Sequence, residues 1–234
     1  MSDIGRALRK YASKERATIN QRFFKTGKGQ YGEDDRFLGV TVPNIRVVAK
    51  QFRDASMSEM KDLLTSEWHE DRLLALIIWT LQFSKANERG KREIFKAYLS
   101  STAQINNWDL VDVSAPNIVG EYLVDRDRKV LLRLARSKSL WERRVAIVST
   151  FAFIRRGDAT STFTIADLVM SDQQDLMHKA TGWMLREVGK KCGKAVLVSY
   201  LLPRYKRMPR TMLRYAIEHF PLVERKRWLL GTMC

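Results

Sequence analysis

Apolar residues recur along the chain at spacings that place them on one side of a helix. Ile4, Leu8 and Tyr11 follow an i, i+4, i+7 pattern, and similar stripes begin at Leu73 and Val130. Alternating apolar and polar runs, which are typical of strands, are hard to find. The 12 glycines and 5 prolines of the chain are sparse, and most of them separate the stripes. The pattern therefore predicts an all-α chain of helices about 10–18 residues long.

Four helical segments share a basic residue that is followed closely by an alanine. The alanines are Ala75, Ala146, Ala180 and Ala216, which lie 71, 34 and 36 residues apart. Because 71 is about twice 35, one unit is missing from the set, and it falls near Leu110. A period near 35 is a little shorter than the roughly 40–47 residues of HEAT helix pairs. We expect a curved α-solenoid of HEAT-like helix-pair repeats with its basic residues along the concave face; chance spacing of alanines is the alternative.

The length of 234 residues allows one or two domains and a sizeable core. We expect a single HEAT-like domain over residues 1–234, with N-terminal helices over about 1–50 and repeats over about 51–234. The longest purely apolar run covers only residues 73–79. A membrane-spanning helix needs roughly 20 such residues, so we expect no transmembrane segment.

The one glycine-rich segment covers residues 25–36 and carries Lys25 and Lys28. It does not have the spacing of a phosphate-binding P-loop, and no buried strand precedes it. Two readings stay open for this segment. It is either a mobile loop that brings the two lysines to a phosphate backbone or a plain connection between helices.

The charge balance is strongly basic, with 42 Lys and Arg against 26 Asp and Glu and a net charge of +16. Such a field attracts polyanions, so nucleic acid is favoured as partner over an anionic membrane surface or ribosomal contacts. Cys192 and Cys234 make a poor disulfide framework, and residues 1–6 lack an apolar secretion signal. We expect a cytoplasmic, bacterial-type protein that is associated with the nucleoid when it binds DNA.

Metal-dependent chemistry is not indicated by the sequence. The three histidines, His69, His178 and His219, lie far apart, and the chain contains no C-x-x-C motif. No G-x-S-x-G nucleophile motif is present, although this alone does not exclude a Ser/His/Asp or Cys/His arrangement. We therefore expect no metal and no cofactor.

An acidic turn at residues 106–112 stands out in this basic chain. On a helix, Trp108 and Asp112 lie one turn apart on the same face, and Asp109 lies close to Asp112. A carboxylate that faces a polyanion weakens binding, so it needs another purpose. One purpose is to stabilise positive charge in a reaction, such as the sugar cation formed when a glycosidic bond breaks. The alternative is that Asp109 caps a helix and Trp108 packs in the core.

Two more tryptophans, Trp141 and Trp183, lie close to basic residues in the sequence. Aromatic rings beside basic residues are typical of surfaces that pack against nucleotides. Core packing is the alternative for any single tryptophan, and we expect it for Trp79 and Trp228.

Four motifs occur in one order along residues 20–220, most of the chain, and together they resemble the AlkD-type DNA alkylation repair glycosylases. The motifs are Phe37-Leu38-Gly39-Val40 with Pro43, Trp108-Asp109-x-Val111-Asp112, Trp141-x-x-Arg144-x-Ala146-Ile147, and Lys179-Ala180-x-Gly182-Trp183-x-Leu185-Arg186-Glu187. Each motif alone is weak, whereas four in order are fairly specific.

This resemblance implies a HEAT-like solenoid that cradles double-stranded DNA and excises cationic N3- and N7-alkylated purines as free bases. It assigns Asp112 as the catalytic carboxylate, Trp108 and Trp183 as sugar contacts, and Arg144 as a backbone contact. The reaction is a monofunctional hydrolysis without a small-molecule cofactor. We expect the protein to act as a monomer on DNA that carries alkylated bases.

Further basic residues are expected to line the same DNA-facing groove. They are Arg143, Lys179, Arg186, Arg210 and Arg214, with Lys25 and Lys28 from the loop. The loop at 25–36 is longer and richer in glycine than in compact members of the family. The aromatic residue expected beside it is therefore open between Phe23, Phe24 and Tyr31. Two other functions are weighed: a non-enzymatic protein that binds distorted or branched DNA, and a scaffold for protein partners.

Overall fold

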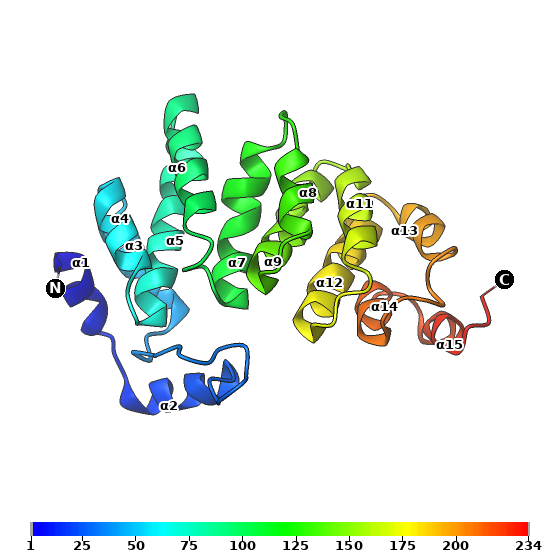
Figure 1. Ribbon diagram of the computed structural model, residues 1–234, viewed down its shortest axis with the longest axis horizontal. Helices are drawn as coiled ribbons and strands as arrows, with labels where there is room; N and C mark the ends of the chain where they lie inside the picture. Colours follow the sequence, from blue (N-terminus) through cyan, green and yellow to red (C-terminus); the bar gives the residue numbers. More distant parts are fainter. Residues whose placement is uncertain (1, 234) are drawn as a thin grey trace. The chain divides into compact units, whose positions relative to one another are not determined.

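The computed structural model describes residues 2–233, and within that part the regular elements are all helical (Figure 1). An isolated bridge between Arg36 and Trp68 is the one extended pairing among the described residues. The predicted all-α class is thus confirmed. None of the helices within residues 2–233 is both long enough and apolar enough to cross a membrane.

Contacts divide the chain into two compact units, one up to Ile118 and one from Val119 onward. The expected single domain over 1–234 stays a prediction. A π-helical turn, η1 (Pro116–Gly120), covers the point where the two units join. The helices of the first unit are α1 (Asp3–Arg9), α2 (Lys14–Phe23), α3 (Val42–Gln51), α4 (Met57–Leu64), α5 (His69–Lys85), α6 (Glu88–Ser100) and α7 (Trp108–Ala115). The helices of the second unit are α8 (Lys129–Ala135), α9 (Leu140–Ser149), α10 (Phe151–Ile154), α11 (Thr160–Leu168), α12 (Asp175–Lys191), α13 (Lys194–Leu201), α14 (Arg210–Ala216) and α15 (Leu222–Leu230).

The helices form successive pairs, as the repeat pattern predicts. In the second unit, α9, α12 and α14 begin at residues 140, 175 and 210, which are 35 residues apart. In the first unit α4 packs on α5, and α5 packs on α7. Helix α7 covers the place near Leu110 where the repeat pattern left a gap. The helix-pair repeat is therefore present, whereas a curved, basic concave face stays a prediction.

Polar side chains set the first residue of several helices. Each accepts a hydrogen bond from a backbone N–H in the first turn that has no partner within the helix. In α4 the cap is reciprocal, because Glu59 also accepts from the backbone of Ser56. The other capping side chains of this kind are Ser2, Ser13, Thr41, Asn87 and Ser139. The first apolar stripe is shorter in the structure than its spacing indicates: α1 ends at Arg9, and Tyr11 is 38% exposed.

The basic residues near the starts of the inner helices have a structural task that the sequence did not reveal. Arg72 of α5 donates to the carbonyl six residues earlier at 2.9 Å, and Arg143 of α9 does the same at 3.0 Å. His178 of α12 also bonds the carbonyl six residues earlier, at 2.5 Å. Each side chain thereby ties its helix to the loop before it. Two of the four repeated basic residues, Arg72 and Arg143, thus have a structural role, and in α12 the neighbouring His178 takes it.

The interior of each unit is apolar, and its helices approach closely where small residues allow it. Trp79 and Trp228 are fully buried, which confirms the core role expected of both. At Gly182 of α12, an added Cβ would lie 2.5 Å from the Met212 carbonyl oxygen and 2.5 Å from the Tyr215 Cβ. Glycine at this position therefore permits α12 and α14 to pack backbone against backbone.

Candidate functional site

Helix α7 carries the acidic turn and presents it on the side away from the core. Leu110, Val111, Ser114 and Ala115 of α7 are buried, while Trp108, Asp109, Asp112 and Val113 are partly exposed. The buried Asn107 precedes the helix, and its side-chain oxygen accepts from the Trp108 backbone N–H at 2.8 Å. Trp108 and Asp112 thus lie one turn apart on the partly exposed face, as their spacing predicts. Burial raises the pKa of Tyr98, and the nearby negative charge of Asp112 adds to this shift.

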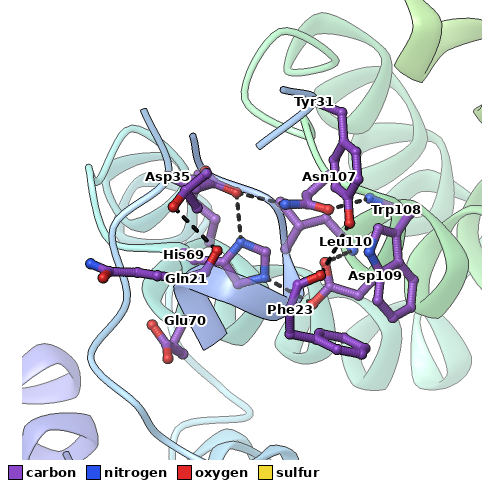
Figure 2. Close-up of polar contacts among 12 residues, drawn as sticks. Gln21, Phe23, Tyr31, Asp35, His69, Glu70, Asn107, Trp108, Asp109 and Leu110 are labelled. Carbon is purple, nitrogen blue, oxygen red and sulfur yellow. Dashed lines mark hydrogen bonds and ion pairs between the residues drawn. The ribbon is translucent and has the colours of Figure 1, made fainter. Parts of the chain in front are cut away.

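Two phenylalanines that follow one another in the chain surround the Trp108 indole. Phe24 stacks on it with ring centroids 5.4 Å apart, and Phe23 meets it edge-on at 5.9 Å. Phe24 is 8% exposed and Phe23 is 60% exposed. Tyr31 donates its hydroxyl to the backbone carbonyl of Phe23 at 3.4 Å (Figure 2). Of the three aromatic candidates beside the loop, Phe23 has the most exposed side chain.

A cleft of about 470 Å³ lies between α2 and the starts of α3, α5 and α7. The structure describes every residue of α2, and none of them is buried. The helix is held at its ends instead, by Phe24 on one side and by a Ser13 N–H to Leu38 carbonyl bond of 3.0 Å on the other. Arg16, Asn20 and Phe23 of α2 therefore line one wall of the cleft, opposite Trp108.

The Phe37–Val40 motif forms the floor beneath α2. Gly39 has φ +76°, and an added Cβ would lie 2.1 Å from the Ser13 carbonyl oxygen, so only glycine fits. The buried Glu70 carboxylate accepts the backbone N–H groups of Leu38 and Gly39 at 2.8 Å each and that of Val40 at 3.2 Å. One side chain therefore satisfies three consecutive N–H groups of the loop.

A buried ionic cluster lies to one side of Trp108, beyond Asn107 and Asp109 (Figure 2). His69, at the start of α5, is 1% exposed and bonds Asp35 through Nδ1 at 3.1 Å and Asp109 through Nε2 at 2.8 Å. Asp35 also pairs with Arg72 and accepts from the Asn107 side-chain amide at 2.7 Å. The cluster thus joins the end of the 25–36 loop to the first turns of α5 and α7.

The electrostatics of this cluster keep His69 charged at neutral pH. Burial alone lowers the pKa of His69, but the charges and hydrogen bonds of Asp109 and Asp35 outweigh it and raise the pKa to about 9. Burial likewise acts to raise the pKa of Asp35, yet bonds and charges from His69, Arg72 and Asn107 hold it below its ordinary value. His69 is therefore an imidazolium that donates from both ring nitrogens.

Sequence reasoning treated His69 only as an isolated histidine and missed this cluster. One signal was available: residues 69–72 read His-Glu-Asp-Arg, four consecutive titratable residues directly before the apolar run at residues 73–79 of the same helix. All four are buried. Buried charges are rare unless they are paired, so such a run indicates partners elsewhere in the chain.

Two of the arginines expected to contact DNA are bonded inside the second unit. Arg143 pairs with Asp172 through Nε at 2.6 Å and Nη2 at 3.2 Å and also donates to two backbone carbonyls. Arg144 is 5% exposed and donates to the Leu176 carbonyl at 2.7 Å. Their contact with DNA stays a prediction.

The other predicted residues are more accessible. Arg186 pairs with Glu218, Lys179 pairs with Asp175 at 2.8 Å, and Arg210 donates to the Leu229 carbonyl. Trp183 is partly exposed, and its ring lies 6.1 Å from that of Phe151. Four of the predicted basic residues lie exposed, namely Lys25, Lys28, Arg210 and Arg214. The first unit brings together Trp108 and Asp112, and the second unit holds Arg144 and Trp183.

The fold and this site define a helical-repeat protein with an aromatic and acidic site in a strongly basic chain. Residues 4–220 match the family model of the DNA alkylation repair enzymes, and the chain belongs to that family. The match confirms the resemblance carried by the four motifs. No curated protein matches the sequence.

A solved structure has a similar fold. It is that of a predicted DNA alkylation repair enzyme from Enterococcus faecalis, with a TM-score of 0.69 and 13% sequence identity. The alignment covers 90% of this chain and 97% of the other. At this level of identity the likeness establishes the fold.

Proposed function

We propose that this repair enzyme is a monofunctional glycosylase that removes cationic N3- and N7-alkylated purines from double-stranded DNA. The observation that carries the proposal is the outward face of α7, where Asp112 lies one turn from Trp108, whose indole meets the exposed ring of Phe23 edge-on. A carboxylate next to aromatic rings can stabilise a cation. The net charge of +16 of the whole chain attracts a polyanion such as DNA.

The chemistry needs few groups because the lesion supplies its own leaving-group activation. An N3- or N7-alkylated purine is already positively charged, so the electron pair of the C1′–N bond can pass to the base without a general acid. Water then adds to C1′ and loses a proton, which yields an abasic site and a free base. Asp112 stabilises the developing sugar cation, and the electron-rich face of Trp108 contributes to the same stabilisation.

The resemblance assigns two residues of the second unit to this reaction, Arg144 to a phosphate and Trp183 to the sugar. Phosphate contacts position the strand without reading its sequence. Binding is therefore expected to be independent of sequence and to weaken steeply with salt, with a slope of about −0.9 in log K for each neutralised phosphate. We propose that the protein acts as a monomer in the cytoplasm and needs no cofactor.

The test is base release from DNA duplexes that contain N7-methylguanine or N3-methyladenine. Both bases should be released, while the neutral lesions uracil and 8-oxoguanine should remain. Asp112→Asn should lower the single-turnover rate by about 10²–10³-fold, the scale for loss of one preorganised electrostatic group. DNA affinity should hold or improve, because one repulsion with phosphate is removed.

Asp62→Asn is the matched control, since Asp62 is an exposed helical aspartate on α4. It should leave both the rate and the DNA affinity unchanged. Full activity of Asp112→Asn would remove Asp112 from the catalytic role. Tight binding of branched or distorted DNA without release of any alkylated base would identify a non-enzymatic DNA-binding protein instead.

A further inference from the structure

His69 occupies a repeat position that an apolar residue fills in α9. Arg72 and Arg143 bond the same carbonyl of their repeats, which aligns α5 with α9 in sequence and makes Leu140 the equivalent of His69. The repeat therefore does not require a histidine at this position. A buried ion pair is commonly no more stable than well-packed apolar residues. The cluster in the first unit therefore needs a reason beyond stability of the fold.

The position of the cluster indicates that reason. Asp109, which accepts from His69, is the neighbour of Trp108 in the first turn of α7. On the other side, the imidazole stacks on Phe37 at 4.7 Å and lies 5.0 Å from the ring of Phe24. Phe24 in turn stacks on Trp108. His69 is thus linked to the Trp108 indole in two ways. It bonds Asp109, the neighbour of Trp108 in α7, and it lies against Phe24, which stacks on the indole.

We propose that His69 is a positioning residue for Trp108: it holds the first turn of α7 and the stacked Phe24 so that the indole is set for the sugar. This inference rests on the proposed function, because it assigns the cluster to that same site. His69 does not touch the substrate in this proposal. Its loss should therefore slow excision and leave DNA affinity unchanged.

Two carboxylates hold the ring because both of its nitrogens carry a proton. The groups that face the imidazole are Asp35 from the loop and Asp109 from α7, with Arg72 and Asn107 behind Asp35. The two phenylalanine rings complete the enclosure. Deprotonation removes one of the two donors, so the hold on Trp108 should loosen at alkaline pH.

The first experiment compares His69→Gln with the double variant His69→Gln/Asp109→Asn. Gln donates from a single nitrogen, so it cannot replace donors at two separate ring positions, and its carbonyl oxygen cannot donate to the second carboxylate. Small misplacements in a site cost up to about 100-fold in rate, so we expect a loss of about 10–100-fold in single-turnover excision. DNA affinity should change by less than about twofold, because no phosphate contact is removed. In the double variant an amide pair replaces the ionic pair, and we expect it to recover about half of this loss on a logarithmic scale.

The matched control is His178→Gln, which alters the other histidine that ties a helix to its loop. If His69 were merely structural, both variants would lose stability and neither would lose rate per folded molecule. Equal rates in His69→Gln and His178→Gln would overturn the proposal. So would a double variant that is no faster than His69→Gln.

A second readout does not depend on catalysis. The protein is labelled with 5-fluorotryptophan, and the Trp108 signal in the fluorine NMR spectrum is assigned with Trp108→Phe. This signal should move in His69→Gln and return toward its original position in the double variant. It should also shift in the wild-type protein as pH rises through about 9, a titration that remains available if His69→Gln does not fold.

The two proposals fail in different ways. Absence of base release by the wild-type protein would overturn the glycosylase function while leaving the fluorine signal to decide the role of His69. If the fluorine chemical shift of Trp108 changes neither in His69→Gln nor in the wild-type titration, the positioning role is overturned, whatever the activity.

Discussion

Stability should fall as His69 loses its proton, and the size of the fall follows from the buried cluster. The pKa of His69 is about 9 in the folded protein and close to 6.5 in an unfolded chain. A pKa raised by folding adds stability that is complete below about pH 6.5 and is lost as pH rises through 9. A gap of about 2.5 pKa units at about 1.4 kcal/mol each makes this contribution about 3 kcal/mol. Solvent screening does not reduce this contribution, because the His69 side chain is buried.

The measurement is urea unfolding followed by circular dichroism at several pH values between about 6 and 9.5, for the wild-type protein and His69→Gln. Subtraction of the two curves removes the groups that titrate equally in both proteins. The difference in the free energy of unfolding between the wild-type protein and His69→Gln should decrease by nearly the full contribution of about 3 kcal/mol between these pH values. NMR of the His69 ring gives the folded pKa directly. A constant difference between the two proteins, or a ring that titrates near 6.5, would refute the electrostatic reasoning.

Four further predictions test helix packing, the roles of two basic residues and the hydrogen bonds of a buried carboxylate. Gly182→Ala should cost about 1–3 kcal/mol by forcing α12 from α14. At Gly189 on α12 an added Cβ meets the end of the Leu197 side chain, which can shift, so Gly189→Ala should cost less than Gly182→Ala in thermal unfolding. Arg143→Ala should cost about 3–5 kcal/mol, because it strands a buried carboxylate. Arg214→Ala should leave stability unchanged and lower the salt slope of DNA binding by about one, because this side chain is exposed. A loss of stability in Arg214→Ala with an unchanged salt slope would contradict its role as a DNA contact. Glu70→Gln should cost about 1–3 kcal/mol, since an amide offers one acceptor where three backbone N–H groups need two, and an unchanged melting temperature would count against it.

Local pattern determined the class of fold and one part of the site. Apolar spacing predicted helices, and the alanine period predicted helix pairs whose inner helices do start 35 residues apart in the second unit. The spacing of Trp108 and Asp112 placed them on one face of a helix, and the structure places them so. These features depend on residues within one or two turns of each other, so the geometry of a helix alone decides them.

Only the tertiary structure decided which distant residues meet. His69 bonds Asp35 and Asp109, which lie 34 and 40 residues away, and Arg143 bonds Asp172, 29 residues away. The sequence led us to expect that Arg143 contacts DNA, and it gave no sign of the bond that this side chain makes to Asp172. The periodicity of a sequence indicates which face of its helix a residue lies on. It does not indicate which residue from a distant segment will contact it. Charge pairing, burial and the resulting pKa of His69 arise from that second kind of contact, which exists only once the helices have packed.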